Sequence, residues 1–299
     1  MPHTTHPLLG QFKILLSSIG FGSMAIFARF AYAEGVSTPT LLFLRFALAA
    51  CLLLPWCLAK GLPWPRGRSL LVLCLMGSLG YAGMAACYFT GLHYASAGTV
   101  SLLLYLFPAI VLVLSTLLFK EPFTRRRLLA TSLAIAGLII TVGQQLSAKP
   151  LGLALGLASA VIYSLYILAG SRLTRGGHPL TSACVVVMSA AACYGGWVLL
   201  DGFNGPQSAF SWAAIFGIAV LGTVAALALF LSGLESTGAT QASLIATAEP
   251  VVTILLAWLF LGEALTLSQA VGGALILLAV VLISRESRPE EVILTDLHD

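Results

Sequence analysis

The stretch Gly233–Thr266 reads GLESTGATQASLIATAEPVVTILLAWLFLGEALT and contains an apolar run, roughly residues 239–260, that is long enough to cross a bilayer. Glu249 and Pro250 lie in the middle of this run. A carboxyl group at the centre of the hydrocarbon costs about 3 kcal/mol on insertion scales. The proline lacks a backbone N–H and crowds the carbonyl of Ala246. Because both residues are unfavourable in a helix that merely spans a membrane, we expect this helix to line a polar cavity.

The same pattern occurs earlier in the chain. Gly91–Thr124 aligns with Gly233–Thr266 without a gap at a distance of 142 positions, and ten of the 34 positions are identical. Leucine and alanine account for some of these identities. The alignment also pairs proline, glutamate and serine, as Pro108/Pro250, Glu121/Glu263 and Ser101/Ser243. This pattern indicates an internal duplication rather than a chance likeness of two apolar helices.

Composition excludes a soluble protein. Of the 299 residues, 59% are hydrophobic and 9% are charged, whereas soluble domains carry about 25% charged residues. The net charge of +4 comes from basic residues in short loops, with no basic and aromatic groove that would bind nucleic acid. The six cysteines fall in or beside apolar runs without a C-x-x-C pair. We therefore expect lipid around the chain, no nucleic-acid partner, no metal and no cofactor.

Ten apolar runs have about the length of a membrane-spanning helix. They predict an all-α integral membrane protein with ten transmembrane helices, at roughly residues 10–32, 39–59, 69–91, 97–119, 126–145, 151–171, 180–200, 210–232, 239–260 and 267–284. The duplication divides these helices into a first five-helix repeat, residues 1–146, and a second, residues 147–285, followed by a tail, residues 286–299.

The basic residues predict the orientation. Twelve of the fifteen lie on the side of the membrane that both termini share, so both termini and the tail are expected in the cytoplasm. Because each repeat has an odd number of helices, the second repeat enters the membrane from the opposite side. Such an inverted repeat is a common plan of secondary transporters, with the substrate site at the midplane between the repeats.

At these residues the chain resembles the EamA-type ten-helix branch of the drug/metabolite transporter superfamily. The resemblance covers about residues 10–285 and rests on Glu249-Pro250, Leu261-Gly262-Glu263-Ala264, Pro108, Phe119-Lys120-Glu121-Pro122 and Leu44-Arg45-Phe46. It implies two five-helix repeats, a central substrate cavity, a location in the bacterial cytoplasmic membrane, and movement of amino acids or other small metabolites, often outward. The chain departs from symmetry in one respect, because Phe107 stands where the second repeat has Glu249.

Two charged residues are candidates for substrate binding. Glu249 can couple proton loss to substrate binding, or it can form a structural hydrogen bond beside the proline. Arg45 lies about two turns into the second helix and cannot lose its charge. It can hold a substrate carboxylate, pair with Glu34 or Glu263, or extend to the interface.

Tyrosines away from the predicted interfaces can line the cavity, or they can pack between helices with the hydroxyl on a carbonyl. They are Tyr81, Tyr88, Tyr105, Tyr163 and Tyr166, and Ser243 is a further candidate. We assign a helix-break or hinge role to Pro108 and Pro250. Glu121 and Glu263 stand at equivalent helix ends and are expected to serve structure or gating.

The sequence thus predicts a transporter and not an enzyme, since it has neither H-E-x-x-H nor G-x-S-x-G, no glycine-rich phosphate loop, and no aspartate in an apolar run. We expect an exporter of amino acids or related metabolites that acts by alternating access. A transporter of drugs, quaternary amines or nucleobases with the same fold remains open, as does a channel. The partners expected are a small-molecule substrate and membrane lipid, and the chain can be a monomer or a homodimer.

Overall fold

The structure is a computed structural model that describes residues 7–91, 94–95, 100, 103–119, 124–142, 149–173, 178–262 and 267–284. The elements in these ranges are all helices. In chain order they are α1 (Pro7–Ala33), α2 (Thr38–Ala59), α3 (Gly67–Leu75), η1 (Met76–Tyr81), α4 (Ala82–Gly91), α6 (Phe107–Phe119), α7 (Arg125–Val142), α8 (Pro150–Leu173), α9 (Pro179–Asp201), α10 (Ala209–Ala219), η3 (Val220–Ala225), α11 (Ala226–Thr237), α12 (Ala239–Ala246), α13 (Glu249–Leu261) and α14 (Leu267–Ser284).

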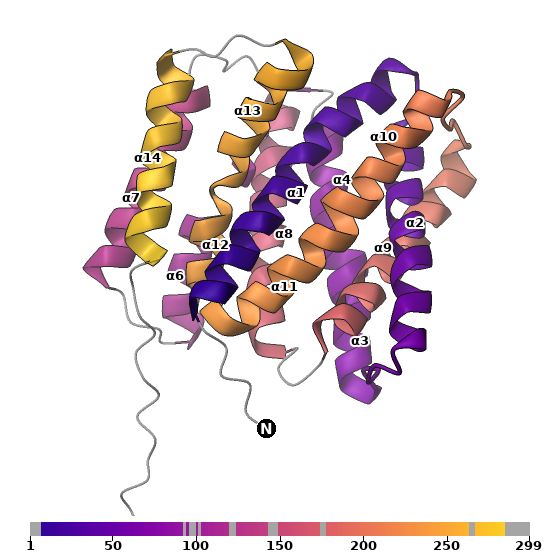
Figure 1. The fold of residues 1–299 in the computed structure, drawn as a ribbon, viewed down its shortest axis with the longest axis horizontal. Coiled ribbons are helices and arrows are strands. Elements are labelled where there is room, and N and C mark those ends of the chain that lie inside the picture. The colour runs from indigo at the N-terminus through magenta and orange to yellow at the C-terminus, as the bar shows by residue number, and fades with distance from the viewer. Residues whose placement is uncertain are drawn as a thin grey trace, which may run out of the picture.

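The helices stand side by side as one bundle, and α1 rises from the end of the bundle at which the N-terminus is marked (Figure 1). Seven described spans are long and apolar enough to cross a membrane. Four of them are single α-helices, two contain a π-helical segment, and one contains a turn between two helices. Two shorter apolar helices are also present. In addition, α7 has 18 residues and begins with three arginines. The protein is therefore a multi-pass membrane protein, and the expected count of ten crossings stays a prediction.

Equivalent helices of the two halves make equivalent contacts. The first helix, α1, packs on α10, α11 and α13 of the second half, and its counterpart α8 packs on α4, η1 and α6 of the first half. The remaining counterparts pair directly, α2 with α9 and α7 with α14. The two halves are thus interleaved rather than set side by side as separate domains, and this packing fits the two-repeat architecture.

The apolar run over residues 239–260 forms two helices, interrupted beside Pro250, where the sequence predicts a helix break or hinge. A turn at Thr247 and Ala248 separates α12 from α13. The cause is local, because Pro250 has no N–H to donate to the Ala246 carbonyl. The chain tightens instead, with the Thr247 N–H on Leu244 O at 3.2 Å and the Ala248 N–H on Ile245 O at 3.1 Å.

The first half has the same interruption at the equivalent place. A turn at Tyr105 and Leu106 precedes α6, which starts at Phe107 with Pro108 as its second residue. The Leu106 N–H bonds to Leu103 O at 3.2 Å, as in the tightened turn of the other half. The two interruptions thus lie 142 positions from each other. In each half of the bundle a short helix, α6 or α13, begins inside the bundle.

Two wide helical turns were not predicted. In the long helix Gly67–Gly91 the segment η1 is π-helical, and in Ala209–Thr237 the segment η3 is π-helical. These two long helices are counterparts in the duplication. π-Turns occur mostly within α-helices and often at functional sites, because they redirect side chains and carbonyl groups.

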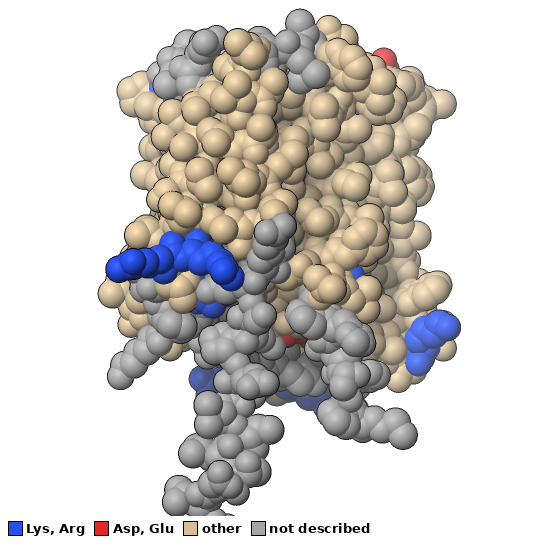
Figure 2. Space-filling model, turned by 60° about the vertical axis from the view of Figure 1, so that its left-hand side comes forward, with Lys and Arg blue, Asp and Glu red and all other residues tan. Residues whose placement is uncertain are grey.

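The outer surface suits lipid. Large apolar side chains are exposed on it, for example Leu199 at 87% and Leu200 at 91%. Figure 2 shows a broad band without charged side chains, and the larger groups of lysine and arginine on that face lie toward its lower edge. That edge is the end of the bundle from which α1 starts (Figure 1).

Candidate functional site

Arg45 is buried in the middle of the bundle, at 2% exposure. Its Nε donates a hydrogen bond to Thr223 Oγ1 at 2.8 Å, and its Nη2 donates to the Tyr81 hydroxyl at 2.8 Å. The guanidinium carbon lies 4.7 Å from the centre of the Phe46 ring. Glu34 is exposed at the end of the bundle, and within the described residues no carboxylate is in ion-pair distance of Arg45. The guanidinium therefore keeps its charge among neutral partners.

The two partners of Arg45 occupy equivalent positions of the two repeats. Tyr81 in η1 and Thr223 in η3 are 142 positions apart, the same offset that relates the two broken helices. The residues before them match as well, with Leu-Gly preceding both. Arg45 thus forms hydrogen bonds with equivalent positions of both repeats, each of which lies in a π-helical segment.

Glu249 is the first residue of α13 and carries Pro250 as the second residue of that helix. Thr253 fixes this helix start, because its hydroxyl lies 3.1 Å from both Glu249 O and Gly22 O of α1. A Cβ on Gly22 would lie 3.0 Å from Glu249 O, so glycine permits the close approach of α1 and α13. The break in the helix therefore holds the glutamate backbone against α1.

The Glu249 carboxyl group is hydrogen-bonded to Tyr105 and interacts electrostatically with Arg45. It interacts in the same way with Tyr81 and Tyr163. Protein surrounds this carboxyl group, although the residue as a whole is only partly buried. The group therefore lies inside the bundle, within electrostatic reach of a positive charge from the other repeat.

Aromatic rings connect the two charged residues. Successive ring centres lie 5.4, 5.6, 6.1, 4.8 and 6.2 Å apart along what we term the aromatic row, formed by Phe46, Tyr81, Tyr166, Tyr163, Phe107 and Tyr105. The row starts at the ring beneath the Arg45 guanidinium and ends at the tyrosine that binds Glu249. Such a surface suits the apolar part of a small molecule whose charged groups lie at its ends.

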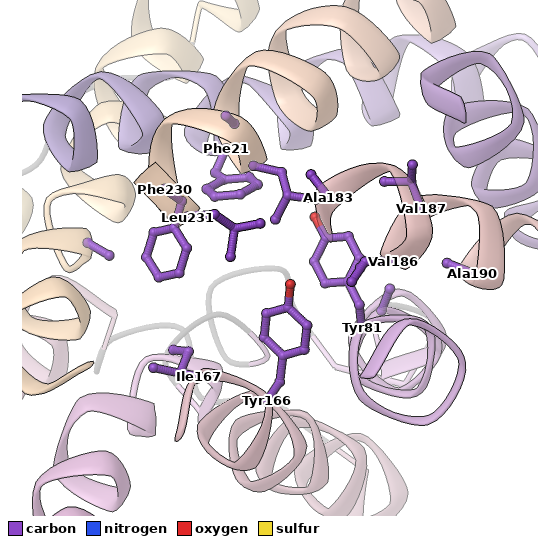
Figure 3. Packing of buried hydrophobic residues seen from close by; sticks show 14 of the residues in the cluster. Phe21, Tyr81, Tyr166, Ile167, Ala183, Val186, Val187, Ala190, Phe230 and Leu231 are labelled. Atoms are coloured by element: carbon purple, nitrogen blue, oxygen red, sulfur yellow. The ribbon is translucent and has the colours of Figure 1, made fainter. Parts of the chain in front are cut away.

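Buried apolar side chains close the bundle beside the aromatic row. We call this cluster the inner plug. Figure 3 shows its members Phe21, Tyr166, Ile167, Phe230 and Leu231 converging from α1, α8 and α11, and Tyr166 belongs to the aromatic row as well. Phe230 and Leu231 follow Thr223 by about two helical turns toward the end of the bundle where Lys13 contacts Ser232. The plug therefore lies between the charged site and the end of the bundle at which α1 begins.

One hydroxyl in the plug has no hydrogen bond. The Tyr166 side chain is 3% exposed, and its hydroxyl is fully enclosed without a partner. Its ring lies over Gly80 of η1, where an added Cβ would stand 3.1 Å from Tyr166 Cδ2. Buried polar groups without partners are rare and costly, so this hydroxyl is an exception that requires a reason.

The other candidate residues have varied locations. Tyr88 lies in α4 and interacts electrostatically with Tyr105, which places it at the Glu249 end of the row. Ser243 is buried in α12, about one turn before the break. Glu121 and Glu263 lie outside the described residues, as does the predicted tail. Within the described part, no group of His, Cys, Asp and Glu could hold a metal ion.

The sequence did not single out Thr223, Phe46 or Phe107 as parts of the site. Threonine in an apolar helix is ordinary, and nothing in its neighbourhood marks it as a partner of Arg45. The duplication could have identified Thr223, however, because Thr223 lies 142 positions after the candidate Tyr81 and is therefore its counterpart in the second repeat.

Comparison with known proteins gives consistent relatives. An "Uncharacterized transporter" of Archaeoglobus fulgidus is 28% identical over 278 residues, which are 93% of this chain and 97% of that protein. The "Uncharacterized inner membrane transporter YicL" of Salmonella typhimurium is 28% identical and covers 93% of this chain and 96% of its own length. Protein PecM of Dickeya dadantii is 28% identical over 82% of each chain.

A solved crystal structure shares the fold, with a TM-score of 0.79 at 20% sequence identity over 93% of this chain and 98% of the other. The sequence profile of the EamA-like transporter family matches the chain twice, over residues 8–143 and 150–285. These two matches cover nearly all of the two interleaved halves described above. The chain therefore belongs to the EamA-like transporter family.

Proposed function

We propose that the protein is a secondary transporter that exports amino acids or related small metabolites across the cytoplasmic membrane by alternating access. In this proposal ten helices cross the membrane and both termini lie in the cytoplasm, in keeping with the basic residues near the α1 end. Family membership and the names of the relatives support membrane transport rather than catalysis. They leave the substrate and the direction of transport to be argued from the site.

The observation that carries the proposal is the pair of opposite charges at the two ends of the aromatic row. Arg45 offers a charged donor to a carboxylate. Glu249 offers a charged acceptor to an ammonium group, and it interacts with Arg45 at a distance rather than as an ion pair. The rings between them can cover an apolar side chain. A zwitterion of amino-acid size satisfies all three features at once.

The closed plug and the interleaved repeats support the proposal of alternating access. The inner plug separates the site from the α1 end, while Glu249 and Tyr163 stay partly accessible. Rocking of the repeats about the breaks at Pro108 and Pro250 would open the plug and close the opposite side. Release of a proton or a hydrogen bond from Glu249 would couple this motion to the substrate. Glu121 and Glu263 are proposed to act in structure or gating.

Two alternatives make different demands on the site. A drug, quaternary amine or nucleobase would use Glu249 and the aromatic row but would leave Arg45 without a role. A channel would need a continuous path, and channels commonly form it from oligomeric symmetry and rings of charge or carbonyls. The inverted repeat within one chain favours a carrier.

The proposal is tested by comparing metabolites in the medium of cells that express the protein or its Glu249→Gln variant at equal membrane levels. We expect an amino acid or close relative to accumulate with the unchanged protein and to fall to background with Glu249→Gln, because the amide can neither release a proton nor balance an ammonium group. Uptake into proteoliposomes with and without a pH gradient then measures the coupling.

The matched control is Glu34→Gln, which makes the same chemical change at an exposed position outside the site. It is expected to export as the unchanged protein does. Full export by Glu249→Gln would remove Glu249 from the mechanism, and accumulation of cations without a carboxylate would favour the alternative substrate class.

A further inference from the structure

The Thr223 hydroxyl accepts a hydrogen bond from Arg45, and its other hydrogen bond fixes it in this acceptor role. A threonine hydroxyl has one proton and two lone pairs. The Thr223 hydroxyl donates that proton to Ile218 O at 3.0 Å, a carbonyl five residues earlier in α10. The remaining lone pairs can then receive the Arg45 Nε–H at 2.8 Å. The hydroxyl is therefore a fixed acceptor with 0% exposure rather than a group that turns between partners.

Tyr81 holds the adjacent nitrogen of the same guanidinium group. Its hydroxyl accepts from Nη2 at 2.8 Å, and its ring lies between the rings of Phe46 and Tyr166. The two hydroxyls thus take the edge of the guanidinium formed by Nε and Nη2. A group bound along one edge by partners from two different helices cannot rotate in its plane.

The other edge of the guanidinium keeps its donors. Arg45 Nη1 makes no hydrogen bond with the described residues, and it is not among the fully enclosed polar atoms that lack a partner. A carboxylate binds arginine through two parallel N–H···O bonds along such an edge. The edge formed by Nη1 and Nη2 thus keeps the N–H groups that a planar acceptor with two oxygens requires.

We propose that Thr223 is a positioning residue, which together with Tyr81 aims the open edge of Arg45 at the carboxylate of the substrate. This inference rests on the proposed function and deepens it, because it selects substrates with a free carboxylate over their amides. The two hydroxyls come from equivalent positions of the two repeats, so the direction of the guanidinium depends on both halves of the protein.

The test uses the purified protein and the twenty protein amino acids, each with its carboxamide, as probes of binding. We expect Thr223→Val, which keeps the shape and removes the hydroxyl, to weaken binding of the bound acids by roughly tenfold or more, as expected for a lost hydrogen bond to a charged group. Binding of the carboxamides should stay unchanged, so the ratio of acid to amide affinity falls. Thr223→Ser, which keeps the hydroxyl, should retain the ratio.

Two further variants make the result specific. Thr131→Val removes a buried hydroxyl that has no hydrogen-bond partner, in α7 away from Arg45, and should leave the ratio unchanged. Tyr81→Phe removes the second hydroxyl beside Arg45 and should lower the ratio as Thr223→Val does, which keeps the test decisive if the valine variant fails to fold.

The failures are distinguishable. If no amino acid binds to the unchanged protein, the proposed function itself is wrong. If acids and amides bind it equally, Arg45 does not receive a carboxylate and the positioning role falls with it. If acids are preferred and both Thr223→Val and Tyr81→Phe keep that preference, the proposed function stands and the positioning role alone is overturned.

Discussion

At the scale of single residues, two buried tyrosines differ in what their hydroxyls contact. The Tyr194 hydroxyl donates to Ala82 O at 2.7 Å, whereas the Tyr166 hydroxyl is enclosed without a partner. A buried polar group without a hydrogen bond costs about 1–3 kcal/mol. This cost destabilises the conformation in which the plug is closed. Opening of the plug would let water reach the Tyr166 hydroxyl and remove the cost.

The two tyrosines therefore give a prediction: replacement by phenylalanine should affect the melting temperature differently at the two positions. Tyr166→Phe should leave the melting temperature of the purified protein unchanged or raise it, because it removes an unsatisfied group. Tyr194→Phe should lower it, by an amount that corresponds to about 1 kcal/mol for a lost hydrogen bond. A lower melting temperature for Tyr166→Phe than for Tyr194→Phe would show that the Tyr166 hydroxyl has a partner.

Sequence reasoning at this scale found the residues that are unusual in a membrane. Arg45 and Glu249 were singled out because charge is expensive in hydrocarbon, and the mid-membrane tyrosines because their hydroxyls need partners. Thr223 was missed because a threonine hydroxyl in a helix can donate its hydrogen bond to a carbonyl of the same helix. The sequence therefore gives no sign that this hydroxyl also accepts a hydrogen bond from Arg45. The partners of a residue depend on packing between helices that are distant in the sequence.

At the scale of elements, the positions of the helices followed from the apolar runs, and α14 has the limits that its run predicted. The sequence predicted a break or a hinge at each of the two prolines, but not which of the two forms. Whether proline bends a helix or ends it depends on what satisfies the free carbonyls, and here Thr247 turns its hydroxyl onto Leu244 O at 2.6 Å. The π-turns left no periodic signal, because they insert one residue into an otherwise apolar run.

The break in the second repeat gives a prediction at this scale. Pro250→Ala restores a backbone N–H that can reach the Ala246 carbonyl, so α12 and α13 should join and turn Glu249 away from its present place. We expect substrate affinity to fall by roughly tenfold, which corresponds to about 1.4 kcal/mol. Equilibrium binding to the purified protein measures this change.

Pro55→Ala is the matched control, because Pro55 lies inside α2 and is exposed on the outer surface of the bundle. Both variants gain the same N–H group, and the control should bind substrate as the unchanged protein does. Equal affinities of the two variants would show that the break at Thr247 and Ala248 does not depend on proline, or that the site does not depend on the break.

At the scale of the whole molecule, the two-repeat architecture was predictable from the duplication. The inversion of the second repeat stays a prediction, because it rests on five helices in each repeat. How the repeats fit together was not predictable, since no pattern in the sequence states that α1 packs on α11 and α8 on α4. The inner plug follows from this interleaving, as its members come from both repeats.

The plug also gives the prediction that tests alternating access. The rings of Phe21 and Phe230 have centres 6.3 Å apart across it. Cysteines at these two positions, in a chain whose six natural cysteines are replaced, can be joined by a short reducible reagent with two thiol-reactive ends. Joining them should stop transport in proteoliposomes, and reduction should restore it.

Each single-cysteine variant, treated with the same reagent, serves as the control and should continue to transport. Transport that continues after both cysteines are joined would mean that α1 and α11 do not separate during the cycle. Such a result would contradict opening at the plug, and it would leave the assignment of the charged site untouched.

The contact of Arg45 with equivalent points of both repeats has a consequence for how such a protein can arise. A side chain that lies equally close to two matching positions sits near their axis of symmetry, where a second copy would bring a like charge to the same place. Arg45 has no charged counterpart, because the residue 142 positions later is the buried Val187. The acid likewise occurs once, since Phe107 stands opposite Glu249. Two identical half-length chains would meet with two arginines or none, so this pair of opposite charges requires two halves that differ in sequence.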